Sequence, residues 1–357
     1  MTAPLLAAPV GVRAIDLREP DARTRIDAFV RAHDQATPFH LSAWSLGVAQ
    51  GCGQTSHTLV AEHADGAIVG LLPMTEIRSP LFGRALVSNG FAVGGGILVT
   101  EVAAIPALAD AAWALAERLG CPTLELRGGP IPADGWQIDT TTYLGFARDL
   151  AASDADELLA IPRKQRAEVR KALDADLEVA IGSAPAELKA HYAVYAESVR
   201  NLGTPVFPKR LFRAVLDQFG DDADILTVRA NGEPVAAVLS VYFNGTVYPY
   251  WGGGTHAARE LRANDRMYFA LMAHARSRGC TRFDFGRSKA GTGPAAFKKN
   301  WGFEGVALPY AKRAAVGTEA REINPLDPRY SRKVDLWKKL PLWVANQLGP
   351  HISRGLG

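Results

Sequence analysis

Short runs in which apolar and polar residues alternate recur along the chain, separated by turns that contain glycine. Residues 57–62 and 67–77 alternate in this way on both sides of Asp65-Gly66, a dipeptide that favours a tight hairpin. A glycine triplet follows at 94–96, and then come an alanine-rich stretch with helical spacing at 103–119 and a short strand-like run. This pattern predicts a unit of hairpin, glycine loop, helix and strand.

The second half of the chain repeats this order. Residues 225–229 and 235–242 predict a hairpin around Asn231-Gly232, followed by a second glycine triplet, a helix and a strand. Gly94 then aligns with Gly252. Duplication of one unit is the simplest account. We therefore expect an α/β (α+β) fold with two tandem domains, each a mixed, mainly antiparallel sheet flanked by helices.

Two of the three cysteines occupy matching corners of this repeat, because Gly120-Cys121 aligns with Gly279-Cys280. Matching positions between helix and strand favour a packing role for both thiols over a nucleophilic one. With Cys52, the three cysteines form no CxxC pair and no even framework, which is typical of a reducing compartment. We expect no metal site and a cytoplasmic protein.

We expect four segments along the chain: an N-terminal domain over 1–150, a basic linker helix over 151–175, a C-terminal domain over 176–315 and an amphipathic tail over 316–357. The linker is predicted as one charged helix, on which Arg163, Arg166 and Arg170 share a face. Such a face is either a solvated surface or a phosphate-recognition site, since guanidinium groups clamp phosphate in a bidentate manner.

The richest candidate chemistry lies between Tyr248 and Phe303. A strand that contains Tyr248 and Tyr250 leads into Gly252 and Gly253, where we expect a loop with freedom for positive φ or for close approach to a ligand. Asn264 and Asp265 then occupy the position expected of a helix N-cap. A glycine loop before a helix N-terminus can hold a phosphate or a carboxylate, although a lone glycine triplet can also be a plain loop. The two tyrosines either line a pocket or belong to the core.

A second strand follows at Phe283-Asp284-Phe285, with Asp284 on the face opposite to both aromatics. Asp284 is the candidate carboxylate base; the alternative is that it orders the next loop through backbone hydrogen bonds. Several basic and polar residues come next, and the candidates for the site among them and their aromatic neighbours are Arg287, Ser288, Phe297 and Lys298. Their company in the sequence, Lys289, Lys299, Trp301 and Phe303, strengthens the functional interpretation.

Composition narrows the classes of function. The 357 residues are 48% hydrophobic and 22% charged, which is ordinary for a globular protein with two cores. A net charge of +3 does not indicate a nucleic-acid coat, so any basic site must be local. The first residues lack the pattern of a signal peptide, and no run has the ~18 apolar residues of a membrane span. HExxH, GxxxxGK[ST] and GxSxG are absent.

The string FDFGRSKAGTG…FKKNWGFE, with IPRKQRAEVRKAL at 161–173 and YAESVRNLGTPVFPKRLF at 195–212, resembles the FemAB family of transferases. In particular it is similar to the branch associated with the XrtA/PEP-CTERM exosortase system of exopolysaccharide-producing bacteria. The resemblance runs from about Phe39 to the C-terminus. It implies two GNAT-like domains and transfer of an amino acid from aminoacyl-tRNA onto a peptidoglycan precursor.

The resemblance also implies roles for individual residues. The family's FK motif, whose lysine assists by charge stabilisation, matches Phe297-Lys298. Aromatic and arginine side chains near Tyr195 and Arg200 would line the acceptor pocket. With Arg166 and Arg170, Arg200 would hold anionic groups in the groove between the domains.

One departure concerns the acyl donor. GNAT enzymes that use acetyl-CoA typically carry an R/Q-x-x-G-x-G/A loop, and neither WGGGTHAAREL nor VGGGILVTEV has that spacing. This favours aminoacyl-tRNA over acyl-CoA as co-substrate, with no tightly bound cofactor. The tail DLWKKLPLWVANQLGPHISRGLG is basic and amphipathic, and we expect it to dock on the protein ahead of touching the inner membrane.

The leading hypothesis is therefore a FemAB-like N-acyltransferase (aminoacyltransferase) that acts by direct attack on a nucleotide- or lipid-linked precursor of the cell envelope, from peptidoglycan or exopolysaccharide synthesis. One alternative is an acyl-CoA-dependent GNAT N-acyltransferase in exopolysaccharide biosynthesis. The other is a non-catalytic GNAT pair that binds a partner of the PEP-CTERM/exosortase system.

Overall fold

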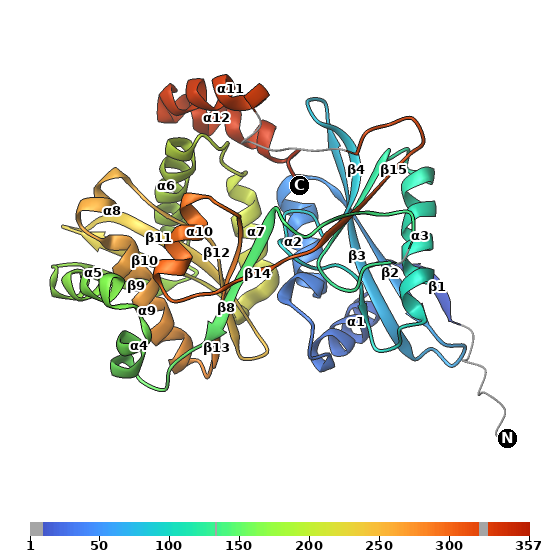
Figure 1. Ribbon diagram of the computed structural model, residues 1–357, viewed down its shortest axis with the longest axis horizontal. Helices are drawn as coiled ribbons and strands as arrows, with labels where there is room; N and C mark the ends of the chain where they lie inside the picture. Colours follow the sequence, from blue (N-terminus) through green and yellow to red (C-terminus); the bar gives the residue numbers. More distant parts are fainter. Residues whose placement is uncertain (1–9, 133, 321–327) are drawn as a thin grey trace.

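The computed structural model describes residues 10–132, 134–320 and 328–357. Two sheets stand side by side, and the helices α2 (Ser42–Cys52) and α7 (Lys209–Phe219) lie between them (Figure 1). Each sheet is mainly antiparallel with one parallel pair of central strands, β4 with β6 in the first and β12 with β13 in the second. The predicted fold class is confirmed.

The first sheet has the strand order β1-β2-β3-β4-β6-β15-β7, and β5 pairs with β3. Its strands are β1 (Gly11–Ile15), β2 (Thr55–Glu62), β3 (Ile68–Ser79), β4 (Gly83–Ser88), β5 (Leu98–Val99), β6 (Thr123–Arg127), β7 (Gln137–Asp139) and β15 (Tyr310–Ala314). The second sheet has the order β14-β8-β13-β12-β11-β10-β9. Its strands are β8 (Tyr143–Asp149), β9 (Glu178–Gly182), β10 (Ala223–Ala230), β11 (Glu233–Phe243), β12 (Thr246–Gly254), β13 (Arg282–Lys289) and β14 (Gly305–Ala307).

The helices form an outer layer on each sheet and a shared layer between the sheets. The remaining helices are α1 (Pro20–Ala32), η1 (Pro38–His40), α3 (Ala104–Arg118), α4 (Asp154–Ala160), α5 (Arg163–Asp174), α6 (Pro185–Leu202), η2 (Gly220–Asp222), α8 (His256–Glu260), α9 (Ala263–Ser277), α10 (Gly293–Asn300), α11 (Pro328–Lys339) and α12 (Leu342–Ser353). One apolar cluster lies under α3, a second under α9 and α10, and a third joins α2, α6, α7 and the facing sides of both sheets. The third cluster makes the space between the domains a true core.

The packing of α2 on α7 explains the glycines of α2. A Cβ atom at Gly51 would lie 2.4 Å from the Cα atom of Leu211, and one at Gly47 would lie 3.1 Å from a methyl group of Val215. Only the absence of a side chain allows the two helices to approach this closely. Trp44 of the same helix is fully buried and stacks on Trp251, with ring centroids 5.5 Å apart. Trp44 thus anchors α2 in the core between the domains.

The two sheets exchange strands. β8 falls in the range predicted for the first domain, yet it pairs with β13 and β14 of the second sheet. In the opposite direction, β15 follows the second domain in the chain and pairs with β6 and β7 of the first sheet. The chain therefore crosses between the sheets twice, and neither sheet is complete within one half of the sequence.

The loop between β4 and β5 lies against the second domain, and four of its successive backbone carbonyls each accept a hydrogen bond from a side chain. Trp44 Nε1 donates to Gly90 O (3.2 Å), and the Tyr250 hydroxyl donates to Phe91 O (2.5 Å). Arg127 Nη1 donates to Ala92 O (3.2 Å), and the Tyr310 hydroxyl donates to Val93 O (2.9 Å). We refer to residues 89–96 as the interdomain loop. Two of its four donors come from β12 and β15.

The prediction of one linker helix over 151–175 is wrong in one respect, because the segment contains two helices, α4 and α5. Pro162 breaks it: this residue has no N–H group to continue the hydrogen bonding of α4, and it becomes the N-cap of α5. At the amino end of the described chain, β1 pairs with β2 at the edge of the first sheet, and α1 follows it.

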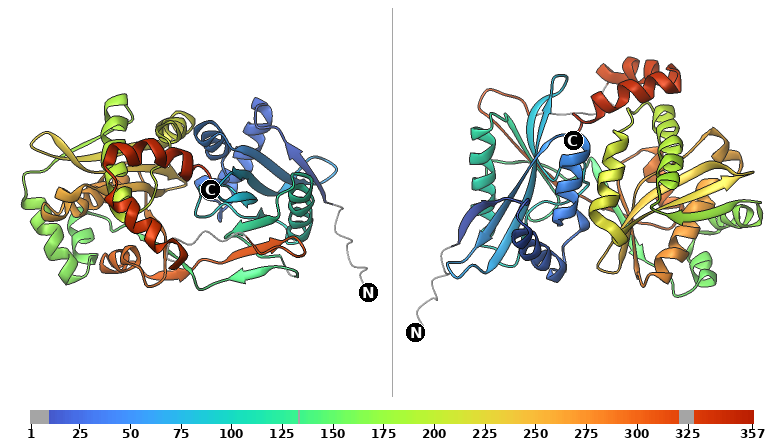
Figure 2. Two further views of the ribbon diagram at one scale, coloured as in Figure 1. Left: turned by 90° about the horizontal axis from the view of Figure 1, so that it is seen from above. Right: turned by 180° about the vertical axis from the view of Figure 1, so that it is seen from behind.

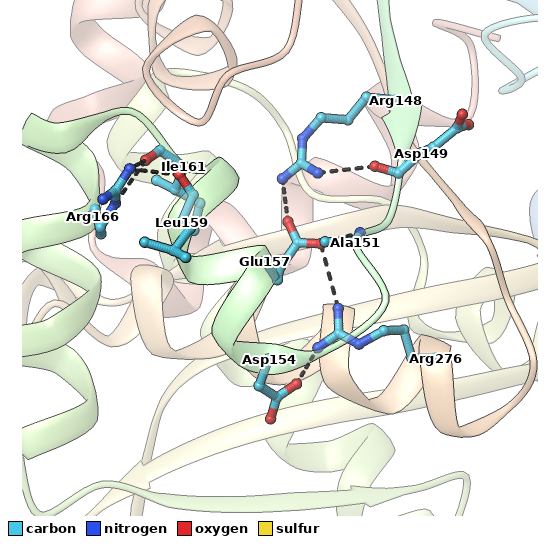
Figure 3. A network of polar contacts seen from close by, with 9 residues as sticks. All are labelled: Arg148, Asp149, Ala151, Asp154, Glu157, Leu159, Ile161, Arg166 and Arg276. Atoms are coloured by element: carbon cyan, nitrogen blue, oxygen red, sulfur yellow. Dashed lines mark hydrogen bonds and ion pairs between the residues drawn. The ribbon is translucent and has the colours of Figure 1, made fainter.

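A buried carboxylate fastens α4 to the second sheet. Glu157 is fully buried and accepts hydrogen bonds from Arg148 of β8 and from the backbone N–H of Ala151 (2.9 Å) (Figure 3). Arg276 of α9 lies 3.4 Å from its second oxygen and also binds Asp154. Two guanidinium groups compensate the one buried charge. The network ties the exchanged strand to α9.

The tail packs on the protein, as expected. α11 and α12 lie along α6, and the residues after α12 reach the space between the two lobes (Figure 2). There Ser353 Oγ donates to Val206 O (2.8 Å), and Gln54 Nε2 donates to Arg354 O (2.7 Å). These bonds connect the tail to both domains.

Because the sheets exchange strands, we predict that both domains unfold together. Ala311→Pro removes hydrogen bonds from the middle of β15, between β6 and β7. We expect it to lower the denaturant midpoint of a single transition and to speed hydrogen exchange in both sheets. Val316→Pro, in an exposed turn, is the matched control. Faster exchange in the first sheet alone would contradict the prediction.

We also predict that Glu157→Gln destabilises the protein by about 3 to 5 kcal/mol, because it leaves Arg148 without its ion-pair partner and leaves Arg276 with only the exposed Asp154. Asp154→Asn is the control: this side chain is 64% exposed, and its ion pair contributes roughly 0 to 1 kcal/mol. Urea unfolding measures both. Equal losses would show that burial of Glu157 is not the cause.

Candidate active site

The central parallel strands of the second sheet separate soon after they meet. β12 and β13 pair only at Thr246 with Arg282 and at Val247 with Phe283. The next residues, Tyr248 and Asp284, stand where the strands diverge. Beyond this point β12 still pairs with β11, and β13 still pairs with β8, so one edge of each strand faces an opening in the sheet. The opening is the structural centre of the candidate site.

Asp284 lies at this opening and orders the turn that follows. Its Oδ1 accepts a hydrogen bond from the backbone N–H of Gly286 (2.8 Å), and Gly286 has a positive φ of 67°. Burial raises the pKa of the Asp284 carboxyl, against the opposite effect of the Gly286 N–H and of Lys298. Both interpretations of this residue therefore have support in its contacts: it orders the loop, and it is a carboxylate whose proton affinity has increased.

Lys298 approaches the same strand from α10. Phe297 packs against Phe285 and Tyr268 in the core, and this anchoring fixes the adjacent lysine. Lys298 Nζ donates to Arg287 O (2.9 Å) and to Gly286 O (3.2 Å). Burial lowers the pKa of Lys298 to about 7, although the nearby Asp284 charge raises it. The side chain can therefore carry or release a proton near neutral pH.

The two tyrosines of β12 face the space between the domains. A β-bulge opposite Leu239 and Ser240 adds one residue to β12 at Tyr250, so Tyr250 and Trp251 share this face. Tyr248 lies near Asp284, and burial raises its pKa, followed by the effect of Asp284. Tyr250 contacts Trp44 and binds the interdomain loop. Tyr248 adjoins the opening, and Tyr250 joins the domains.

The glycine triplet after these tyrosines is not the loop that we predicted. Gly252, Gly253 and Gly254 continue β12 in extended conformation, without positive φ. A Cβ at Gly253 would lie 2.3 Å from Ser198 Oγ, so the residue permits α6 to pack on the strand. The sequence analysis proposed that glycine allows close approach of a ligand. The close approach exists, but the group that approaches the strand is α6 of the same chain.

Carboxylates of the protein lie at the N-termini of α8 and α9, the two helices that follow β12. The His256 N–H at the start of α8 donates to Glu197 Oε1 (2.8 Å). The prediction of Asn264 and Asp265 as N-cap is wrong, because α9 begins at Ala263 and its N-cap is Arg262 in left-handed conformation. Gln165 Nε2 donates to Asp265 Oδ1 (2.6 Å). Burial raises the pKa of Asp265 to about 6.

The predicted arginines do not converge on Lys298. Arg166 donates to the carbonyls of Leu159 and Ile161 at the end of α4 (Figure 3), so its guanidinium caps a helix. Arg170 is exposed on α5. Arg200 stands at the far end of α6 and donates to Lys338 O (3.2 Å) in α11. The side chains of these three arginines face different surroundings.

Tyr195 is buried between α6 and α7, where its ring lies 5.4 Å from Phe212 and 5.7 Å from His191. Ser288 is buried in β13 opposite Leu144. Arg287 donates to the Tyr310 hydroxyl, and its guanidinium carbon lies 4.5 Å from the ring centre of Tyr143. No sequence signal pointed to these two tyrosines, because only strand exchange brings β8 and β15 beside β13.

The cysteines show no activated thiol. Cys52, Cys121 and Cys280 are buried and free. Burial raises the pKa of all three thiols, in the case of Cys52 to about 12.

A separate cavity of ≈ 300 Å³ lies between α1, α2 and α7 and contains none of the predicted site residues. The opening at β12 and β13 is where the titratable groups gather.

We predict that Lys298→Met stabilises the protein most at low pH and that this advantage declines as the pH rises. The folded protein releases the Lys298 proton near pH 7, whereas the unfolded chain keeps it up to about 10.5. Wild-type stability therefore gains up to about 1.4 kcal/mol per pH unit across this window. Urea unfolding between pH 6 and 10 measures the difference, and Lys299→Met at the exposed neighbouring position is the control. An equal pH dependence in both variants would refute the prediction.

Comparison with known proteins gives the family of the fold. The family model described as "Acetyltransferase (GNAT) domain" matches residues 163–299. No curated protein matches the sequence significantly. Among solved structures, FemX is 16% identical, with a TM-score of 0.65, and the match covers 84% of this chain and 96% of FemX.

Two further structures share the architecture. A tandem GNAT protein from the clavulanic acid biosynthesis pathway is 14% identical, with a TM-score of 0.56 and coverage of 87% of this chain and 100% of that one. The C-terminal domain of a proposed lysylphosphatidylglycerol synthetase from Agrobacterium fabrum is 15% identical, with a TM-score of 0.56 and coverage of 82% and 91%. Identities this low establish the fold and not the substrate. Residues 163–299 thus match a GNAT acetyltransferase domain, and the chain shares the fold of FemX and of the tandem GNAT protein.

Proposed function

We propose that this protein is a FemAB-like N-acyltransferase that transfers an aminoacyl group from aminoacyl-tRNA to an amine of a cell-envelope precursor. The acceptor would be a nucleotide- or lipid-linked intermediate of peptidoglycan or exopolysaccharide synthesis. The observation that supports this most is the pair of buried groups at the opening, Lys298 with a lowered pKa and Asp284 with a raised pKa. Displaced pKa values of this kind are typical of sites that move protons.

In the proposed step, the amine nitrogen of the acceptor attacks the carbonyl carbon of the aminoacyl ester. A C–N bond forms, and the C–O bond to the ribose of the tRNA breaks. Asp284 accepts the proton that the amine loses and donates it to the ribose oxygen as that oxygen leaves. Lys298 in its charged form stabilises the oxyanion of the intermediate. The step needs neither a metal nor a covalent enzyme intermediate.

The choice of donor rests on charge near the helix starts after β12. In a site for the diphosphate of acyl-CoA, backbone N–H groups at a helix N-terminus face the phosphates. Here the His256 N–H binds Glu197, and Asp265 lies in the first turn of α9. Carboxylates at these positions repel a diphosphate. The exposed Arg163, Lys164 and Arg170 of α5 instead offer charge for a nucleic-acid backbone.

The second candidate donor is acyl-CoA. It is favoured by the open strand edges between β12 and β13, which can pair with the amide groups of an extended ligand.

No helix in the described part of the chain is long and apolar enough to cross a bilayer. For a lipid-linked acceptor, the exposed Leu336 and Trp343 beside Lys338 are the tail surface that suits an anionic membrane.

The test offers charged tRNA and acetyl-CoA separately, each with a nucleotide-linked peptidoglycan precursor and a lipid-linked polysaccharide precursor as acceptors. We expect transfer from charged tRNA. Lys298→Ala should slow it by about 10² to 10³, with acceptor affinity retained, and Lys299→Ala should leave the rate unchanged.

Transfer from acetyl-CoA alone would establish the second candidate. Acceptor binding without transfer from either donor would indicate a non-catalytic GNAT pair. A rate that is unaffected by Lys298→Ala would remove the proposed role of this lysine.

A further inference from the structure

Arg287 is a cation without an acidic partner beside the proposed reaction centre. The pairing of β13 with β8 shifts by one residue between Asp284 and Arg287, because Asp284 faces Ala147 and Arg287 faces Gly145. This bulge puts the two side chains on the same face of the strand. The Arg287 carbonyl also accepts the hydrogen bond from Lys298 Nζ. Its guanidinium group therefore points into the interdomain space from the same short segment that holds the candidate catalytic groups.

The surroundings of the guanidinium group are aromatic. Its carbon lies 4.5 Å from the ring centre of Tyr143 and 5.3 Å from that of Tyr310. The two rings lie close to each other, with centroids 4.8 Å apart. Nη1 donates to the Tyr310 hydroxyl, which itself donates to the interdomain loop. Tyrosine rings stabilise a cation in part, but they do not neutralise it.

The charges in this region do not balance. Glu125 interacts electrostatically with Arg287, but it also binds Arg127 (2.6 Å) and lies 3.6 Å from Lys312. Arg287 forms no ion pair with any residue that the structure describes. Three cations thus share the charge of Glu125. Burial acts to lower the pKa of the Arg287 guanidinium group, and the nearby tyrosines and Glu125 raise it. An oxyanion of a ligand would add a direct countercharge.

We propose that Arg287, with Tyr143 and Tyr310, forms a subsite for an oxyanion, a carboxylate or a phosphate, of the amine acceptor. This deepens the proposed function and rests on it for the identity of the ligand as acceptor. The planar guanidinium offers several N–H donors to such a group, and the tyrosine rings restrict it to one orientation. Acceptors that carry both an amine and an oxyanion would be held with the amine toward Lys298 and Asp284.

The test compares three small amines that differ in their anionic group: β-alanine with a carboxylate, phosphoethanolamine with a phosphate, and ethanolamine with none. Ligand-observed NMR titration of the full chain measures their affinities without any need for turnover. Since hydrogen bonds to a charged group contribute about 1.5 to 3 kcal/mol, the wild type should prefer an anionic amine by about 10- to 100-fold. Preference for phosphoethanolamine or for β-alanine identifies the phosphate or the carboxylate as the recognised group.

Arg287→Gln should abolish this preference, because it removes the charge but keeps hydrogen-bond donors. Arg287→Lys should retain part of it. Arg118→Gln, an exposed arginine on α3, is the matched control and should behave as the wild type does. Thermal unfolding of each variant checks that it is folded. We expect Arg287→Gln to remain stable, because it deletes an unpaired charge.

Equal affinity for all three amines in the wild type, no measurable binding at millimolar concentration, or a preference that survives in Arg287→Gln would overturn the proposal. Failure of the proposed function gives a different result. If no donor supports transfer while the preference depends on Arg287, the oxyanion subsite stands and the reaction assigned to the site is wrong.

Discussion

The arrangement of the two domains depends on the hydrogen bonds to the interdomain loop, residues 89–96. Four successive carbonyls, from Gly90 to Val93, accept a side-chain donor from α2, β12, β6 and β15. A buried carbonyl that lost its donor would cost about 1 to 3 kcal/mol, so the loop defines one relative position of the sheets. Tyr250 belongs to this set and stands two residues after Tyr248. The contact that joins the domains therefore also positions the edge of the opening.

Burial has opposite consequences at two places in the second domain. Glu157 is fully buried, but two arginines and a backbone N–H compensate it, and the result is a structural tie. Lys298 is nearly as buried, yet its hydrogen bonds go to carbonyl oxygens, and the pKa of its ammonium group falls to about 7. The two residues differ in their hydrogen-bonding and ion-pair partners and not in how deeply they are buried. Incomplete compensation is what makes the opening the candidate functional site.

Strand exchange gives the first domain a part in the site although it holds none of the candidate catalytic groups. β8 brings Tyr143 to the second sheet, and β15 begins with Tyr310 at the boundary between the sheets. Both tyrosines meet Arg287 there. A site built in this way forms only when both sheets are complete, which couples its geometry to the cooperative stability of the whole chain.

Local signals in the sequence carried much of the fold. The hairpins at Asp65-Gly66 and Asn231-Gly232 form as predicted, and so does α3, because turn chemistry and helical periodicity act over a few residues. The duplicated order of elements predicted two related units, and the lysine of the FK motif, Lys298, lies beside β13 in the structure. The tail docked on the protein as its interrupted amphipathic pattern indicated.

What the sequence could not show depends on partners that are distant in the chain. Gly252 and Gly253 predict a loop when read alone, but they pair with β11 as part of a strand, and Gly253 also allows α6 to pack closely. From the sequence, Arg166 is a candidate for phosphate binding, but in the structure its guanidinium group donates to a carbonyl at the end of α4. The meeting of Arg287 with Tyr143 and Tyr310 follows from two crossings between the sheets, which no local pattern records. Periodicity determined the elements, and tertiary packing decided which polar groups are satisfied by the chain and which remain available to a substrate.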